Sequence, residues 1–406
     1  MTEMWQRWTI AGVLSCGCQE AQPPDRAATP APRPPAATRE PAAARDASPP
    51  APARADAATA PAEAAVAPAE AAVAPAVDAA APVSASAASA AVAESSPPPP
   101  LSEVQRAALL AGDEERIVSK REHFTVSNEY RHDLWFPYVR GLGGAYVGVA
   151  SDQNYTLMAV ARSEVGYLLD LDRQVVRLHR VYMALIAASP DPDAFLARFA
   201  EAARRDTEAV LQAGLSDMSA RDRAEALQFV ADNRAALREY LTAVKATRRG
   251  EQGVTWLADP ELYRYIRGMV AGGRLRALNG NLAGKTAMAT IAASARELGL
   301  TINLLYLSNA EEYLFYTPGF VANVRALPGG PDSVVLRTIH DRFEGWESCG
   351  EGDRRWNYQV QPLADFQTRL ADRRNTARTA MLARATEAGA IHRVARGVSV
   401  FKRAEG

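Results

Sequence analysis

Polar side chains follow two short apolar segments in the middle of the chain, 145–150 (AYVGVA) and 166–169 (GYLL). The first segment leads into four polar residues, Ser151, Asp152, Gln153 and Asn154. The second leads into Asp170 and Asp172, and Asp170 lies 22 residues after Gly148. An acid at this kind of spacing accepts hydrogen bonds from ribose hydroxyls in dinucleotide sites. The pattern predicts a site for a nucleoside-type small molecule, with Asp170 at the ribose and Asp172 as a helix N-cap.

Three later apolar segments also end in polar residues. In chain order they deliver Asn279 and Asn281, then Ser308 and Asn309, then Arg337, Thr338 and His340. Each segment is rich in aliphatic and β-branched residues, which is typical of a buried strand. Ligands of open parallel sheets bind beyond the carboxyl ends of the strands. We therefore expect these side chains to surround one site together with those that follow the first two strands.

Helical patterns separate the predicted strands, and SDQN (151–154) is expected to supply capping side chains to the first helix. This alternation predicts an α/β fold, Rossmann-like, with a mostly parallel sheet, flanking helices and a helical insertion at about 190–270. The segment 356–385 is expected to be helical in its second half, and 391–403 is strand-like. Four aromatic residues precede the first strand, Tyr130, Trp135, Phe136 and Tyr138. They belong either to the core or to the wall of a ligand pocket.

The order of these motifs resembles the class I S-adenosylmethionine-dependent methyltransferase fold. The matching stretches are VGVASDQN, LLDLD, NGNL and LYLSN, within about residues 140–340. The chain also resembles a group of bacterial exported or lipoprotein-like proteins of unassigned activity. The resemblance implies S-adenosylmethionine as a possible cofactor. It would be held by Gly148, Ser151, Asp152, Gln153, Asn154, Asp170, Asn281, Ser308 and Asn309.

The first loop departs from the family pattern E/D-x-G-x-G-x-G, because only Gly148 matches it clearly. Two hypotheses follow. The protein is a methyltransferase-like enzyme, or it is a catalytically silent, membrane-anchored binding or scaffolding lipoprotein. A retained site would be open at the strand ends, and a silent domain would have it filled by the aromatic group or the insertion. Residues 280–286 (GNLAGKT) have three residues between the glycines, where a phosphate loop has four, so Lys285 and Thr286 are expected to begin an ordinary helix.

The N-terminal quarter has a different character. Residues 1–18 are expected to be a signal segment in which VLSC resembles a lipobox, with Cys16 lipidated, or less favourably Cys18. Residues 19–100 are rich in Ala and Pro, contain the repeat APAEAAV at 60–66 and 67–73, and predict a disordered tether. Residues 101–406 would form the α/β domain. The expected location is the cell envelope, with the membrane reached through the lipid anchor only, and a cytoplasmic location is the alternative.

Charge and ligand-forming residues exclude several function classes. Residues 101–406 carry 40 basic and 37 acidic residues, which does not favour nucleic acid as a partner. The five histidines are scattered and the folded part holds only Cys349, so neither a metal site nor a disulfide framework is expected. Cys349 lies in a polar loop, and nothing in the sequence identifies a base that would activate it as a nucleophile. A small molecule is the expected ligand, and the sequence leaves the oligomeric state open.

Overall fold

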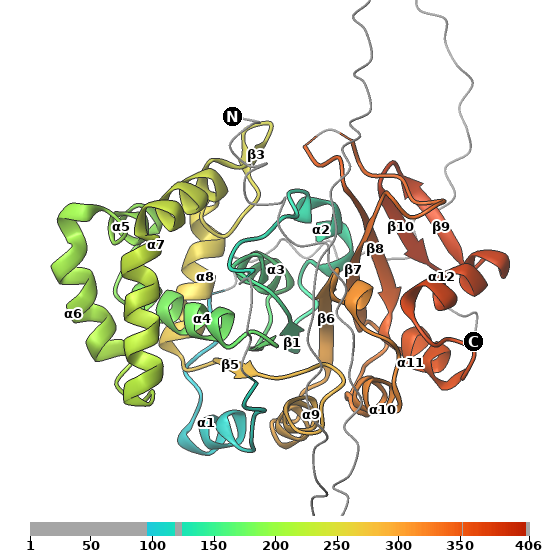
Figure 1. Ribbon diagram of the computed structural model, residues 1–406, viewed down its shortest axis with the longest axis horizontal. Helices are drawn as coiled ribbons and strands as arrows, with labels where there is room; N and C mark the ends of the chain where they lie inside the picture. Colours follow the sequence, from blue (N-terminus) through green and yellow to red (C-terminus); the bar gives the residue numbers. More distant parts are fainter. Residues whose placement is uncertain (1–95, 118–123, 351, 403–406) are drawn as a thin grey trace, which may run out of the picture. The chain divides into compact units, whose positions relative to one another are not determined.

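One eight-stranded sheet organises the part of the chain that the computed structural model describes, residues 96–117, 124–350 and 352–402 (Figure 1). The spatial order of the strands is β5-β2-β1-β6-β7-β8-β10-β9. In chain order the strands are β1 (Ala145–Gly148), β2 (Val165–Asp170), β5 (Leu275–Asn279), β6 (Ile302–Ser308), β7 (Val334–His340), β8 (Trp356–Pro362), β9 (Ile391–Ala395) and β10 (Val398–Phe401). The predicted signal segment and most of the predicted tether lie outside the described residues.

In chain order, the first five strands of this sheet (β1, β2, β5, β6 and β7) are mutually parallel. β2 pairs with β1 and β5, and β6 pairs with β1 and β7, all in parallel register. The chain therefore winds outward from β1 to β5 and then returns across β1 to continue with β6. In such sheets the point where the winding reverses is where ligands bind. The expected Rossmann-like α/β fold is confirmed, and its reversal point lies between β1 and β6.

The far end of the sheet is antiparallel and includes a strand that the sequence did not predict. β8 pairs antiparallel with β7, β10 lies parallel to β8, and β9 is antiparallel to β10. The segment of β8, WNYQVQP, has polar residues at alternate positions, and all three are buried. They are satisfied inside the protein, because Gln359 and Gln361 accept hydrogen bonds from Arg337, and Asn357 accepts one from Ser399. Period-two polarity therefore did not mark a solvent-facing side here.

Helices cover both faces of the sheet, and the alternation of strand side chains divides the core between them. Tyr146 of β1 packs in the layer with α3 (Gln153–Ala161), α4 (Arg173–Ala187) and α8 (Pro260–Ala271). Val147, one residue later, packs in the opposite layer. That second layer contains α1 (Glu103–Leu110), α9 (Ala287–Glu297), α10 (Pro318–Ala326), α11 (Leu363–Ala371) and α12 (Arg378–Glu387).

A block of helices lies between β2 and β5 in the chain. It comprises α5 (Pro192–Ala197), α6 (Arg204–Gly214) and α7 (Ala220–Ala246), followed by the short pair β3 (Arg248–Arg249) and β4 (Gln252–Gly253). These helices pack against α4 at the β5 side of the sheet, far from β9 and β10 in Figure 1. Among the described helices, none is both long and apolar enough to span a membrane. The block instead supplies side chains to the strand ends.

Candidate functional site at the strand ends

The loop after β1 turns sharply and directs its polar side chains into the protein. Ala150 has a left-handed backbone conformation, with φ of 68°, which is uncommon for a residue other than glycine. Asn154 holds the turn, because its Nδ2 donates to the carbonyl oxygens of Val149 and Ser151 at 2.8 and 2.6 Å. Its Oδ1 accepts a hydrogen bond from Tyr146 at 2.7 Å. Asn154 is thus a fully buried support of the loop.

Gly148 provides the room for this arrangement. A Cβ atom at this position would lie 2.1 Å from Oδ1 of Asn154 and 2.5 Å from the ring of Tyr146. The space that the missing side chain leaves is therefore taken by the protein's own residues. The resemblance had implied that Gly148 would help to hold a cofactor.

Asp152 binds the helical block and does not cap α3. It occupies the N-cap position of α3 without a side-chain hydrogen bond to that helix, so the capping prediction is wrong. Its carboxylate accepts hydrogen bonds from the Tyr240 hydroxyl at 2.6 Å and from Trp256 Nε1 at 3.0 Å. Burial raises the pKa of Asp152, against the lowering effect of these two donors. Ser151 donates to the carbonyl oxygen of Thr125 at 2.7 Å.

Asp170 lies at the carboxyl end of β2, and its carboxylate is engaged by backbone. Oδ2 accepts from the amide of Ala150 at 2.9 Å, and Oδ1 accepts from the amide of Asp172 at 2.8 Å. Burial raises the pKa of Asp170 to about 6. Asp172 accepts from the amide of Gln174 and caps α4, so that prediction is confirmed. Asp170 therefore ties the loop after β1 to the start of α4.

Residues 113–117 lie along the carboxyl end of β5 and engage its last residues. The carboxylate of Glu114 accepts from the amide of Asn279 at 2.9 Å. The carboxylate of Glu115 accepts from the amides of Asn281 at 3.1 Å and Thr286 at 2.9 Å. The amide of Ile117 donates to Oδ1 of Asn279 at 2.8 Å. This segment covers the strand end where the resemblance had implied that Asn281 would hold the cofactor.

The glycines of GNLAGKT give space to the same glutamate. A Cβ atom at Gly280 would lie 2.6 Å from Oε2 of Glu115, and one at Gly284 would lie 2.1 Å from its Oε1. Thr286 occupies the N-cap position of α9. The first helical residues of such a loop attract negative charge. Here that charge is a carboxylate of the same chain.

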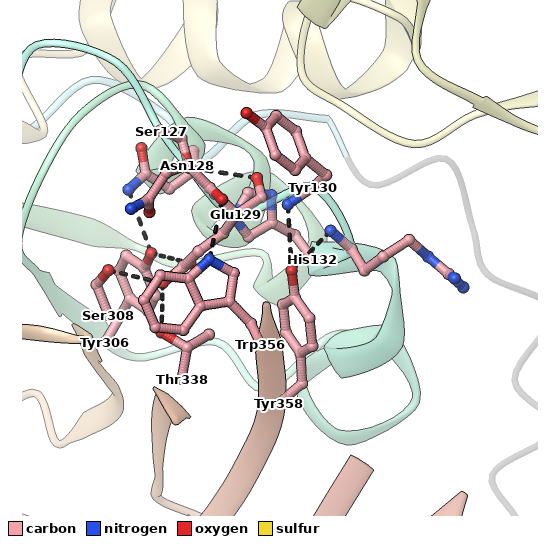
Figure 2. A network of polar contacts seen from close by, with 12 residues as sticks. Ser127, Asn128, Glu129, Tyr130, His132, Tyr306, Ser308, Thr338, Trp356 and Tyr358 are labelled. Carbon is pink, nitrogen blue, oxygen red and sulfur yellow. Dashed lines mark hydrogen bonds and ion pairs between the residues drawn. The ribbon is translucent and has the colours of Figure 1, made fainter. Parts of the chain in front are cut away.

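The carboxylate of Glu129 lies at the ends of β6 and β7 (Figure 2). Its Oε1 accepts hydrogen bonds from Ser308 at 2.7 Å and Thr338 at 2.6 Å. Its Oε2 accepts one from Tyr306 at 2.5 Å and lies 3.3 Å from Nε2 of His132. The side chain of Glu129 is fully buried. Burial alone would raise the pKa of Glu129, but His132 and the hydroxyl donors outweigh it and hold that pKa below its usual value.

The Glu129 cluster connects to the loop after β1 through Gln153, whose Nε2 donates to the hydroxyl of Tyr306 at 3.2 Å. Ser308 has a left-handed backbone, with φ of 50°, at the end of β6. Residues in such conformations often gather at functional sites. Asn309 follows half-buried at the start of the 3₁₀ helix η4 (Ala310–Tyr313). The structure thus joins Gln153 and Ser308 around one buried carboxylate.

The aromatic group contributes mainly to the core. Trp135, in the 3₁₀ helix η2 (His132–Trp135), is buried and packs edge-on against Tyr306 and Tyr358, with ring centroids 5.7 and 4.9 Å apart. Phe136 is also buried, whereas Tyr130 is exposed and Tyr138 half-buried. The amides of Tyr130 and Arg131 donate to the hydroxyl of Tyr358. The core interpretation therefore holds for Trp135 and Phe136.

The predicted site residues form two groups. Each group is hydrogen-bonded to a different part of the chain. Asp170 and Asn281 lie at the β2–β5 side, beside residues 113–117. Ser151–Asn154 and Ser308 lie at the β1–β6 side, with Glu129 and the helical block. Arg337 lies elsewhere, in a buried ion pair with Glu311 at 2.5 Å.

Sequence reasoning missed the engaging residues, chiefly Glu114, Glu115, Glu129, Tyr240 and Trp256. One signal was available. Three acids, Asp113–Glu115, come soon after the carboxyl end of α1, where negative charge is unfavourable unless it has another partner. Within residues 96–117, 124–350 and 352–402, no three acidic, histidine or cysteine side chains are grouped to hold a metal ion.

The fold and site together define a Rossmann-like α/β domain whose strand ends are engaged by its own carboxylates. The chain belongs to the family described as "Domain of unknown function (DUF7790)", whose model matches residues 124–402. A search of curated proteins found no match. Among solved structures, the chain is similar to the rRNA methyltransferase AviRa from Streptomyces viridochromogenes, at 13% identity and a TM-score of 0.24. That match covers 53% of this chain and 75% of the other. The fold assignment rests on the strand order.

Proposed function

We propose that this domain is a non-catalytic binding module of the cell envelope, built on a Rossmann-like fold. The observation that carries the proposal is the occupation of the strand ends by the chain itself. Glu129 and Asp152 are buried there with hydrogen bonds from at least two donors each. Ligands of this fold class ordinarily enter from that edge of the sheet.

Energetics favour this interpretation on the β1–β6 side. A ligand that entered there would have to separate Glu129 from its donors, and stripping a buried charge of its partners costs about 3–5 kcal/mol. Access by way of Asp152 would likewise break its bonds to Tyr240 and Trp256, which attach the helical block. These contacts support a structural role for Ser151–Asn154 and Ser308.

The envelope location rests on the sequence pattern at Cys16 and on the Ala/Pro-rich segment that follows it. S-adenosylmethionine is a cytoplasmic cofactor, so an exported domain would not meet it. Fractionation with palmitate labelling tests this location. We expect label in the envelope fraction that Cys16→Ser removes and Cys18→Ser retains. An unlabelled protein in the cytoplasmic fraction would contradict it.

A second candidate function is binding of a nucleoside-type molecule such as S-adenosylmethionine at the β2–β5 side. The position of Asp170 favours it, since an acid at the end of the second strand is where a ribose would be bound. Binding there would require residues 113–117 to leave the strand end. Their contacts with Asn281 and Thr286 are hydrogen bonds to a partly exposed carboxylate, which are weaker than the buried contacts of Glu129.

Calorimetry of the full chain separates the two candidates. The binding-module proposal expects no saturable heat with S-adenosylmethionine or S-adenosylhomocysteine up to about 1 mM ligand, which corresponds to a binding free energy weaker than about −4 kcal/mol. Saturable binding that Asp170→Ala weakens by about 1.5–3 kcal/mol would support the nucleoside site instead. Glu208→Ala, an exposed change on α6, is the control.

A further inference from the structure

A pocket of about 350 Å³ lies beside the carboxyl-terminal end of β7, and Glu129, Asp152 and Asp170 are not among its lining residues. It is an open pocket lined by α12, the loop after β7 and the start of β9, and α12 and β9 lie at the same end of the sheet in Figure 1. Most of its wall is apolar, and the larger apolar side chains are Ile339, Phe343, Trp346, Leu382 and Ile391. Its volume lies at the lower end of the range of small-molecule pockets, which are also lined mainly by apolar side chains.

One wall of the cavity carries a buried guanidinium. Arg378, the first residue of α12, is only 2% exposed, and its guanidinium carbon lies 5.2 Å from the ring centroid of Phe343. Nη1 donates to the carbonyl oxygen of Thr338 at 3.0 Å, and Nη2 lies 3.2 Å from Glu312. Nε has no hydrogen-bond partner within the described residues. A donor of this buried cation is therefore unmatched.

The acid beside Arg378 does not balance the local charge. Glu312 also pairs with Arg342 at 2.8 Å, so two guanidiniums share a single carboxylate. Arg393 of β9 also lines the pocket, and its guanidinium donates a hydrogen bond to the carbonyl oxygen of Gly345. The charged residues that line the pocket are Arg378, Arg393 and one acid, Glu344. The cavity thus combines an apolar body with a net positive charge.

We propose that this cavity binds a small organic monoanion, with an aromatic or branched apolar body and one carboxylate or sulfonate group. The apolar side chains would bury the body of the ligand. The anionic group would lie toward the arginines, because guanidinium and carboxylate form charge-assisted hydrogen bonds. This inference deepens the proposed binding function, on which it rests, by giving the module a ligand and a site that Glu129, Asp152 and Asp170 do not line.

A fluorescence titration of the full chain tests the proposal with two probes of similar shape. One is the anion 1-anilinonaphthalene-8-sulfonate, and the other is the uncharged N-phenyl-1-naphthylamine. The native chain is expected to bind the anion saturably and more tightly than the neutral probe. Equal affinity for both probes would overturn the proposal, because the arginines would then contribute nothing.

Two variants locate the probe. Ala383→Trp fills the cavity from α12 and should weaken binding of both probes at least about tenfold, the effect of losing about 1.4 kcal/mol. Ala364→Trp, on the exposed side of α11, is the matched control and should leave both affinities unchanged. An affinity that Ala383→Trp does not lower would refute the site.

Arg393→Gln keeps the test valid if Ala383→Trp does not fold, since Arg393 is exposed. This change should weaken the anionic probe about three- to fivefold, as expected for a partly solvated charge, and leave the neutral probe unaffected. Equal losses for both probes would overturn the charge argument. S-adenosylhomocysteine should not compete with the anionic probe, and competition would place that probe at the strand ends and refute the proposal. If calorimetry shows that S-adenosylhomocysteine binds but it does not compete with the anionic probe, only the proposed non-catalytic function is contradicted, and the pocket proposal stands.

Discussion

At the scale of single residues, carboxylates of the chain itself occupy the strand ends, where ligands of this fold class bind. Asp152, Asp170 and Glu129 each accept hydrogen bonds from two or more donors. The donors to Asp152 and Glu129 lie far from them along the chain, whereas the donors to Asp170 are the amides of Ala150, in the loop after β1, and of Asp172, two residues away. The acid in each case joins segments of the chain that would otherwise separate. Removing one such acid should therefore affect stability more than any surface acid does.

Glu129→Gln tests this role directly. The amide would place donor hydrogens against the hydroxyls of Tyr306, Ser308 or Thr338, and it would remove the charge that attracts His132. We expect a loss of about 3 kcal/mol in the free energy of unfolding, measured by urea titration. Glu208→Gln on the exposed face of α6 is the control. A loss below about 0.5 kcal/mol, the size of an ordinary surface change, would contradict the assignment.

Asp170 should leave a signature in the pH dependence of stability. Its pKa is raised to about 6 in the folded protein, above the ordinary value of about 3.9 for an unfolded chain. The folded state therefore keeps a proton that the unfolded state loses, and this contribution is fully present below about pH 4 and lost as the pH rises through about 6.

The comparison is between the native chain and Asp170→Asn, which cannot titrate. From pH 4.5 to pH 7, the native chain should lose stability relative to the variant, as measured by denaturant midpoints at each pH. Because every other titrating group is common to both proteins, the difference isolates Asp170. Identical pH profiles would show that the carboxyl group is not shifted.

At the scale of elements, the segment 113–117 behaves as an extra edge contact for β5 and the start of α9. It offers Glu115 to the amides of Asn281 and Thr286 and takes the space that Gly280 and Gly284 leave. Loops of this kind attract anions because several amides converge on them. Here the carboxylate of Glu115 occupies the place of such an anion, so the glycines are explained without a phosphate ligand.

Glu115→Ala should expose these amides to solvent. We expect hydrogen exchange in the peptide around Asn281–Thr286 to accelerate about tenfold or more, because a hydrogen bond to a charged group contributes about 1.5–3 kcal/mol. Arg116→Ala, an exposed neighbour in the same segment, serves as the control. If exchange in that peptide is unchanged, Glu115 does not protect the loop.

At the scale of the whole molecule, the helical block and the sheet share buried contacts. Tyr240 and Trp256 donate to Asp152, and Trp256 also packs against Tyr155 of α3, with ring centroids 5.1 Å apart. The described residues fall within one compact unit. A block that is attached through buried groups of the sheet layer is expected to unfold with the sheet.

The unfolding transition of the whole chain should therefore be single. Tryptophan fluorescence, to which the buried Trp135, Trp256 and Trp356 contribute, should change at the same denaturant concentration as far-UV circular dichroism. Asp152→Ala should lower that midpoint for both signals together. A fluorescence transition that precedes the loss of helix would mean that the block detaches first.

Much of the fold was predictable from the sequence because its signals are local. Aliphatic segments such as INLLYLS mark buried strands, and Asp172 before an amphipathic segment marks a helix start. β8 escaped prediction because Asn357, Gln359 and Gln361 are polar yet buried, and their partners Arg337 and Ser399 are distant along the chain. Polarity alone cannot show that such groups are satisfied inside.

The sequence by itself determined the strands of the sheet other than β8, their alternation with helices, and which polar residues stand at the ends of the parallel strands. Those features depend on side-chain periodicity and on neighbours a few residues away. Only the tertiary structure decided what those polar residues contact. Glu129 is 177 residues from Tyr306, and Asp152 is 88 residues from Tyr240. Since no local pattern records such partners, the same polar edge that predicted a ligand site became, in the folded chain, a set of internal contacts.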